Sequence, residues 1–137
     1  MQIAAYTDGG SRGNPGNAAT GGIIVTLQKE VLFEFSQYIG IATNNEAEYS
    51  ALVTVLEWVS QQPEKYSSIT CYLDSKLVVE QLNKNWKIKE PRMRTFAQKC
   101  WDIISEFQIT ATFVHIPREQ NKIADALVNK ALDSQQL

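Results

Sequence analysis

The sequence has only two cysteines and one histidine, and it lacks both a long hydrophobic run and an excess of positive charge. Neither Cys71 nor Cys100 has a second cysteine or a histidine at the spacing of a zinc site, which excludes a zinc-binding module. We expect both to be buried free thiols in the reducing cytoplasm. No apolar stretch approaches the roughly 18 residues that cross a bilayer, and the first residues do not resemble a signal peptide. No membrane association is therefore expected.

The charges of the chain are nearly balanced. Thirteen Lys and Arg against fifteen Asp and Glu give a formal net charge of −2, so any binding of a polyanion must rely on a local patch. Hydrophobic residues make up 44% of the chain, which is enough for a core and excludes a disordered protein. We expect a single domain over residues 1–137.

Changes in hydrophobic periodicity predict nine elements in the order β-β-β-α-β-α-α-β-α. A glycine-rich loop is expected directly after the first strand, over residues 9–16. Strands are predicted at residues 3–7, 21–27, 31–39, 68–73 and 109–116. Helices are predicted from residue 45 to Pro63, at 76–82, from Pro91 through residue 104, and at 119–132. This order is typical of an α/β fold in which helices pack on a mixed sheet.

Two aspartates each follow a predicted strand. Asp8 precedes the glycine-rich loop and Asp74 precedes a short helix, so both are expected at the carboxyl ends of strands, where α/β sheets bind ligands. Asp74 also has a structural alternative, because an aspartate in this place often caps the following helix.

The glutamates of the first helix have different predicted positions. At about 100° per residue, Glu48 lies in the middle of the apolar stripe, whereas Glu46 and Glu57 lie on the opposite, solvent side. Glu46 also completes a capping box with Thr43. The stripe around Glu48 consists of Leu52, Val55, Leu56 and Val59. A buried carboxylate must be neutralised, paired or bound to metal, so Glu48 is either a metal ligand or the partner of a basic residue.

Asp125 lies at the edge of the apolar stripe of the last helix, and it could join the same site. Three or four carboxylates at one edge of a sheet repel one another, and a hard divalent cation removes that repulsion. Carboxylate and water ligands favour Mg²⁺ or Mn²⁺.

Four short segments of the sequence resemble those of type 1 ribonuclease H. They are Thr7-Asp8-Gly9-Gly10 with the loop 13–16, then Thr43-Asn44-Asn45 with Glu48, then Leu73-Asp74-Ser75, and finally Asn121 with residues 124–127. The segment 117–121 and the short region after Asp74 are more similar to the compact archaeal-type branch, which also occurs in bacteria. The resemblance covers nearly the whole chain.

This resemblance implies a fold, an activity and a metal site. The fold would be ribonuclease H-like, with a five-stranded mixed sheet of three antiparallel strands and then two parallel ones, and with helices on both faces. The activity would be hydrolysis of the RNA strand of RNA–DNA hybrids, leaving 5′-phosphate and 3′-hydroxyl ends. Asp8 would bridge two Mg²⁺ ions, Asp74 would hold one of them and Glu48 and Asp125 the other, with Mn²⁺ as a substitute for Mg²⁺. The protein would act as a monomer without an obligate protein partner.

The resemblance also implies residues that bind the hybrid. These are Gly9, Ser11, Asn14, Thr43, Asn44, Asn45 and Trp86. The asparagines are candidates for contacts with 2′-hydroxyl groups, which distinguish RNA from DNA, and Thr43 is a candidate for a DNA phosphate. Two structural alternatives stay open: Asn44 and Asn45 could serve only the start of the helix, and Trp86 could be a core tryptophan rather than a platform for a deoxyribose.

An auxiliary residue is expected near the fourth carboxylate. Many members of the family carry a histidine on a flexible loop there, but His115 falls inside a predicted strand. Arg118, on the loop expected after Pro117, is the better candidate to reach a phosphate. Two other functions remain as alternatives: a non-catalytic domain that binds hybrids, which would usually have lost a carboxylate, and a transposase or junction resolvase, which would lack the Thr-Asn-Asn and Asp-Gly segments.

Overall fold

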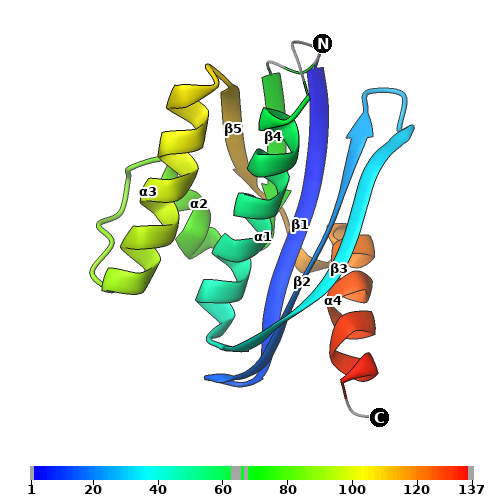
Figure 1. Cartoon of the computed structure of the whole chain (residues 1–137), viewed down its shortest axis with the longest axis vertical. Helices are drawn as coiled ribbons and strands as arrows, with labels where there is room; N and C mark the ends of the chain where they lie inside the picture. The colour runs from blue at the N-terminus through cyan, green and yellow to red at the C-terminus, as the bar shows by residue number, and fades with distance from the viewer. Residues whose placement is uncertain (1, 63–65, 67, 136–137) are drawn as a thin grey trace.

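The computed structural model describes residues 2–62, 66 and 68–135, and its centre is a five-stranded mixed sheet (Figure 1). The strands are β1 (Gln2–Gly13), β2 (Gly16–Thr26), β3 (Val31–Ala42), β4 (Ser68–Leu73) and β5 (Thr110–His115). Their order across the sheet is β3-β2-β1-β4-β5. The pairs β1–β2 and β2–β3 are antiparallel, whereas β1–β4 and β4–β5 are parallel. The predicted sheet of three antiparallel and two parallel strands is thus confirmed.

Helices cover both faces of the sheet, as predicted. Helices α1, α2 and α3 lie on one face and α4 lies on the other (Figure 1). Their bounds are α1 (Asn44–Ser60), α2 (Lys76–Leu82), α3 (Pro91–Glu106) and α4 (Lys122–Ser134), and a 3₁₀ turn, η1 (Arg118–Gln120), precedes α4. None of the helices in the described ranges is long and apolar enough to cross a membrane.

The main core lies between the sheet and α1. The predicted apolar stripe of this helix is fully or almost fully buried, and it packs on side chains of β1, β4 and α3. Burial of each such side chain contributes about 1.5–3 kcal/mol to the hydrophobic driving force. Cys71 and Cys100 are buried free thiols, as predicted, and burial raises the pKa of each to about 12.

The prediction of a glycine-rich loop over residues 9–16 is wrong. β1 continues through Asp8 and the glycines to Gly13, β2 starts at Gly16 instead of residue 21, and only Asn14 and Pro15 separate the two strands. Residues 9–13 pair with residues 16–20 of β2, so their backbone groups are satisfied by a ladder. Asp8 therefore lies inside a long strand and not at its carboxyl end.

Other element bounds differ less. β4 and α2 have the predicted bounds, whereas β3 extends three residues further than predicted, to Ala42. α4 starts at Lys122 because η1 occupies the preceding residues, including Glu119, where the helix was expected to begin.

Candidate metal centre

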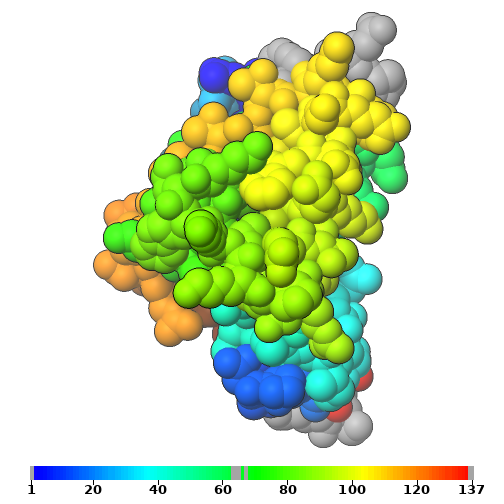
Figure 2. Space-filling view, turned by 90° about the vertical axis from the view of Figure 1, so that its left-hand side faces the viewer, coloured from blue at the N-terminus to red at the C-terminus, as the bar shows by residue number. Residues whose placement is uncertain are grey.

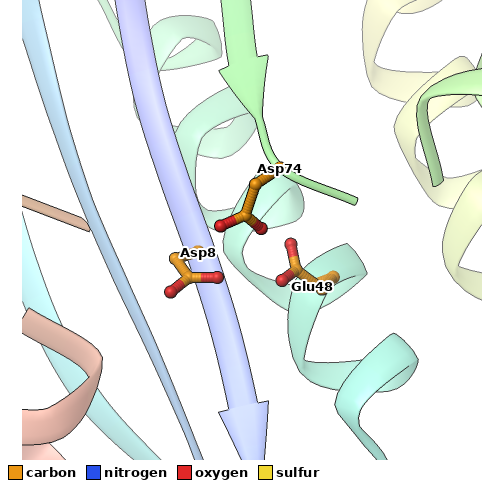
Figure 3. Close-up of side chains that lie close together, drawn as sticks. All are labelled: Asp8, Glu48 and Asp74. Carbon is orange, nitrogen blue, oxygen red and sulfur yellow. The ribbon is translucent and has the colours of Figure 1, made fainter. Parts of the chain in front are cut away.

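Three carboxylates from three elements meet at one place beside the sheet. Asp8 comes from the middle of β1, Glu48 from α1, and Asp74 from the residue after β4, and Figure 3 shows their carboxylates turned toward one another. One oxygen from each lies within 4.8 Å of the others. The pairing of β1 with β4 ends at Tyr6 and Tyr72, so the carboxylates lie just beyond the point where these strands separate.

Two glycines let the helices come close enough to build this site. A Cβ atom on Gly9 would lie 2.2 Å from the Ala47 carbonyl carbon and 2.5 Å from the Glu48 nitrogen, so the backbone of α1 rests directly on β1. On the other face, a Cβ atom on Gly21 would lie 2.7 Å from the Ala124 oxygen of α4. Gly21 pairs with Asp8 in the sheet. These close approaches place Glu48 beside Asp8 and bring the first turn of α4 to the same part of β1.

Burial, and after it the neighbouring charges, raise the pKa values of the three carboxylates. Burial, together with the charges of Asp74 and Asp125, raises the pKa of Asp8 to about 6, although a hydrogen bond with Glu48 opposes the shift. Burial and then the neighbouring Asp8 hold the pKa of Glu48 well above its ordinary value. Burial also raises the pKa of Asp74, and the positive charge of Arg118 opposes that change. Bound protons or a bound cation would therefore stabilise such a site.

The donor set fits a hard divalent cation. Glu48 Oε2 is buried without a hydrogen-bond partner among the described residues, and all the facing ligand atoms are carboxylate oxygens. The predicted alternative, a salt bridge of Glu48 to a basic residue, is wrong within the described ranges, where the ion pairs are Arg12–Asp133 and Arg92–Glu46. The capping alternative for Asp74 is wrong too, because the Ser75 side chain caps α2.

Asp125 and Arg118 stand at the border of this cluster. They line a depression of about 310 Å³ together with Asp8, Glu48 and Asp74, but Asp125 is outside the group of three oxygens. Arg118 lies in the 3₁₀ turn η1, where an open loop was expected, because the chain tightens directly before α4. His115 is exposed at the end of β5, and its charge affects the Asp74 pKa in the same direction as that of Arg118 but ranks below it.

Glu46 is not on the solvent side as predicted. Only 9% of the residue is exposed, since α3 packs beside α1 and Arg92 Nη1 lies 3.5 Å from Glu46 Oε2. The capping box is confirmed: Glu46 Oε1 accepts from the Thr43 backbone N–H, and Thr43 Oγ1 accepts from the Glu46 N–H. This hydrogen bond to the Thr43 backbone lowers the pKa of Glu46, in contrast to the raised pKa of Glu48. Glu57 is exposed, as expected.

Part of the predicted hybrid-binding set forms a network next to the carboxylates. The Asn44 side-chain oxygen accepts from the Ser11 N–H at 2.9 Å, and the Asn14 side-chain oxygen accepts from the Asn44 N–H at 3.0 Å. These bonds tie the end of the β1–β2 hairpin to the start of α1, so the asparagines have structural roles as well. Asn45 is half-buried, and Gly9 is buried beneath α1.

Trp86 lies apart from the carboxylates, on the connection between α2 and α3. The residue is 45% exposed, so the alternative of a core tryptophan is wrong. It lines a second depression, of about 950 Å³, whose basic and aromatic side chains include Lys84, Lys87, Arg94, Lys99 and Trp101. Figure 2 shows the connection and α3 on one face of the molecule, with the end of the β1–β2 hairpin and the start of α1 below them.

The structure also assigns a place to Asn121, for which the sequence indicated no individual role. Its side chain is buried, and its Nδ2 donates to the Thr7 carbonyl oxygen at 2.8 Å. A polar residue just before an amphipathic helix is usually a cap, but Asn121 makes no side-chain bond to α4. Its partner is 114 residues away in the sequence, so no local pattern could reveal the contact.

Comparisons with known proteins give a consistent picture. The profile of the family described as "Reverse transcriptase-like" matches residues 6–131. A Ribonuclease HI of Halobacterium salinarum is 39% identical over 96% of this chain and 65% of its own length, and a Ribonuclease H of Trichodesmium erythraeum is 32% identical over 95% of this chain and 88% of its own. Among solved structures, the crystal structure of LC11-RNase H1 in complex with an RNA/DNA hybrid matches this chain with a TM-score of 0.93 and 42% sequence identity. The match covers 98% of this chain and 99% of that one.

The first of these relatives is longer than the chain, which spans 65% of it. Mycobacterial relatives at 38% identity are longer still, and the chain spans 36% of their length. Identity, coverage and fold nevertheless agree across the profile, the curated relatives and the solved structures, and the chain belongs to the ribonuclease H family.

Proposed function

We propose that this chain is a metal-dependent endoribonuclease that hydrolyses the RNA strand of RNA–DNA hybrids and leaves 5′-phosphate and 3′-hydroxyl ends. The observation that carries the proposal is the cluster of Asp8, Glu48 and Asp74, with one oxygen each within 4.8 Å, in a chain of the ribonuclease H family. A non-catalytic hybrid-binding domain would have no need to maintain this repulsive cluster. The LC11-RNase H1 complex supports the choice of substrate.

The proposal assigns two divalent ions to the site, Mg²⁺ with Mn²⁺ as a substitute. Asp8 would contact both ions, Asp74 would help to hold one, and Glu48 and Asp125 the other. When bound, the ions would supply an activated water and charge stabilisation for the departing oxygen. The chain itself would keep the carboxylates in place through the contacts of Gly9 and Gly21, so that little reorganisation is needed.

Arg118 would act on the substrate rather than on a proton. Arg118 lines the same depression as Asp8 and Asp74, and a guanidinium group can neutralise phosphate oxygens in a bidentate manner. A guanidinium group is not deprotonated in proteins, so Arg118 would help the cleaved phosphate to leave without serving as a base.

The hybrid would lie across the face that joins the carboxylates to the β1–β2 hairpin. Ser11, Asn14 and Asn44 are linked by hydrogen bonds there, and with Thr43 and Asn45 they would contact the backbone and the 2′-hydroxyl groups. Lys84, Lys87 and Arg94, which lie around the exposed Trp86, would provide the local positive charge that the net charge of −2 does not supply. Action as a monomer in the cytoplasm is part of the same proposal.

The decisive experiment uses a labelled RNA–DNA hybrid with and without Mg²⁺, with DNA and RNA duplexes as controls. We expect cleavage of the RNA strand only, and only with metal. Asp8→Asn should abolish turnover while the folded structure persists. If this variant kept more than about a tenth of the activity, a barrier change below about 1.4 kcal/mol, the central role of Asp8 would be wrong. Binding of the hybrid without cleavage would instead favour the non-catalytic alternative.

A further inference from the structure

Asn121 connects β1, η1 and α4 at the border of the metal centre. The residue is 1% exposed and lies at the junction of η1 and α4. Its side-chain Nδ2 donates to the carbonyl oxygen of Thr7, the residue directly before Asp8, at 2.8 Å. One buried amide thus joins the backbone of β1, next to Asp8, to the start of α4.

The contact lies where β1 loses a neighbouring strand. Pairing of β1 with β4 ends at Tyr6 and Tyr72, whereas pairing with β2 continues to Gly13. A buried strand carbonyl beyond the end of a ladder needs another donor, because an unpaired one costs free energy. The Asn121 amide supplies that donor for Thr7, and it does so at the opening that the carboxylates occupy.

The backbone of Asn121 carries the connection to the two bordering residues. Its N–H donates to the Arg118 carbonyl oxygen at 2.9 Å, and its own carbonyl oxygen accepts from the Asp125 N–H at 3.1 Å. The turn that contains Arg118 therefore ends at Asn121, and the first turn of α4, which contains Asp125, begins there. A displacement of Asn121 from Thr7 would move both of them relative to Asp8.

The remaining atom of the amide gains nothing for stability. Asn121 Oδ1 is buried without a hydrogen-bond partner among the described residues. Burying an acceptor without a donor costs free energy, and an apolar side chain of similar size would avoid the cost. The bond from Nδ2 to Thr7 is the one feature of the amide that such a side chain cannot replace.

We propose that Asn121 is a positioning residue whose bond to Thr7 sets the start of α4 against Asp8, and so determines how Asp125 and Arg118 join the carboxylate cluster. Asp125 is the carboxylate that lies outside the tight group of three, so its contribution depends on where α4 begins. The inference rests on the proposed function for its kinetic readout, whereas its metal-binding readout is independent of catalysis.

The first test compares Asn121→Leu with Asn83→Leu. Asn83 makes the same kind of bond, from its Nδ2 to the Phe113 carbonyl oxygen at 3.3 Å. Neither Asn83 nor Phe113 is part of the proposed site. We expect Asn121→Leu to lower kcat about ten-fold or more with little change in KM for the hybrid and a melting temperature close to that of the control. Asn83→Leu should leave kcat and KM unchanged. Equal kinetics in the two variants would overturn the proposal.

The second test is a double-mutant cycle with Asp125→Asn, measured as Mn²⁺ affinity by calorimetry on the whole chain. If Asn121 acts through Asp125, Asn121→Leu should weaken Mn²⁺ binding in the otherwise unchanged chain and should have no further effect in the Asp125→Asn background. An equal weakening in both backgrounds would show that Asn121 does not act through Asp125. If Asn121→Leu fails to fold, Asn121→Ala removes the same bond in both tests.

The two proposals can fail separately. A chain that binds Mn²⁺ but never cleaves hybrids would refute the proposed function, and the calorimetric cycle would still decide the role of Asn121. If the chain cleaves hybrids but the effects of the two substitutions on Mn²⁺ affinity are additive, the proposed function stands and the positioning role is refuted.

Discussion

Single residues of α1 show how two glutamates in one turn acquire opposite properties. Glu46 is buried but well paired, with its pKa lowered, whereas Glu48 is buried, has no cationic partner among the described residues and has a raised pKa. Glu46→Gln should therefore cost at most about 1 kcal/mol through the capping box and leave catalysis nearly unchanged. Glu48→Gln should remove most of the activity and should hold or raise the melting temperature of the metal-free protein. Activity assays and thermal unfolding check both variants, and equal losses of activity would contradict the assignment.

Arg118 and His115 compete for the auxiliary role at the same carboxylates. Both favour the charged form of Asp74, but Arg118 does so more strongly, and it lines the depression whereas His115 lies at an exposed strand end. Arg118→Ala should lower kcat about ten-fold, on the order of 1.4 kcal/mol, and His115→Ala should change it little. The pH profile of kcat gives a second measurement. A limb near the ordinary histidine value of about 6.5 that disappears in His115→Ala would reverse the assignment.

At the scale of elements, the position of α1 depends on a single glycine of β1. A Cβ atom on Gly9 would overlap the backbone of α1, whereas one on Gly10 would have its nearest neighbour, Val128, at an ordinary 3.7 Å. Gly9→Ala should therefore destabilise the fold by about 1–3 kcal/mol, and Gly10→Ala should be close to neutral. Urea unfolding measures the difference. Because the displaced helix carries Glu48, Gly9→Ala should also weaken Mn²⁺ binding. If Gly9→Ala were as stable as Gly10→Ala and bound Mn²⁺ with the same affinity, α1 would not need this close contact.

At the scale of the whole molecule, the carboxylate cluster makes stability depend on pH and on metal. The folded state binds a proton on Asp8 more tightly than the unfolded chain does, since its pKa rises from 3.8 to about 6. The corresponding stabilisation is complete below about pH 4 and is lost as the pH rises through about 6, and Glu48 changes in the same direction. Without metal, the free energy of unfolding should therefore be larger at pH 5 than at pH 8, by about 1.4 kcal/mol from Asp8 alone, and Glu48 should add to the difference.

Divalent metal should reverse this trend, because its ligands must be deprotonated. Mg²⁺ should raise the melting temperature more at pH 8 than at pH 5, and Glu48→Gln should reduce both the pH dependence and the effect of Mg²⁺. Urea and thermal unfolding with EDTA or Mg²⁺ at the two pH values provide the measurements. A metal-free protein that is more stable at pH 8 than at pH 5 would contradict the raised pKa values of Asp8 and Glu48.

Features that depend on local periodicity and on short motifs could be predicted from the amino-acid sequence. The helical phase of Glu48 against Leu52, Val55 and Leu56 indicated a buried carboxylate, because helix geometry relates these positions regardless of the rest of the fold. The order of the nine elements and the capping box at Thr43 follow from the same local physics. The motifs and their order indicated the family and, through it, the order of antiparallel and parallel strands.

Features that depend on long-range contacts could not be predicted before the fold was known. The glycines after Asp8 indicate a turn when they are considered alone, but pairing with β2 and the close approach of α1 keep them in a strand. Glu46 is buried because Arg92 and α3 reach it from 46 residues away, and Asn121 acts on Thr7 across 114 residues. Contacts of this kind arise when packed elements satisfy buried backbone and charged groups, so they are set by the fold as a whole and leave no periodic signal in the sequence.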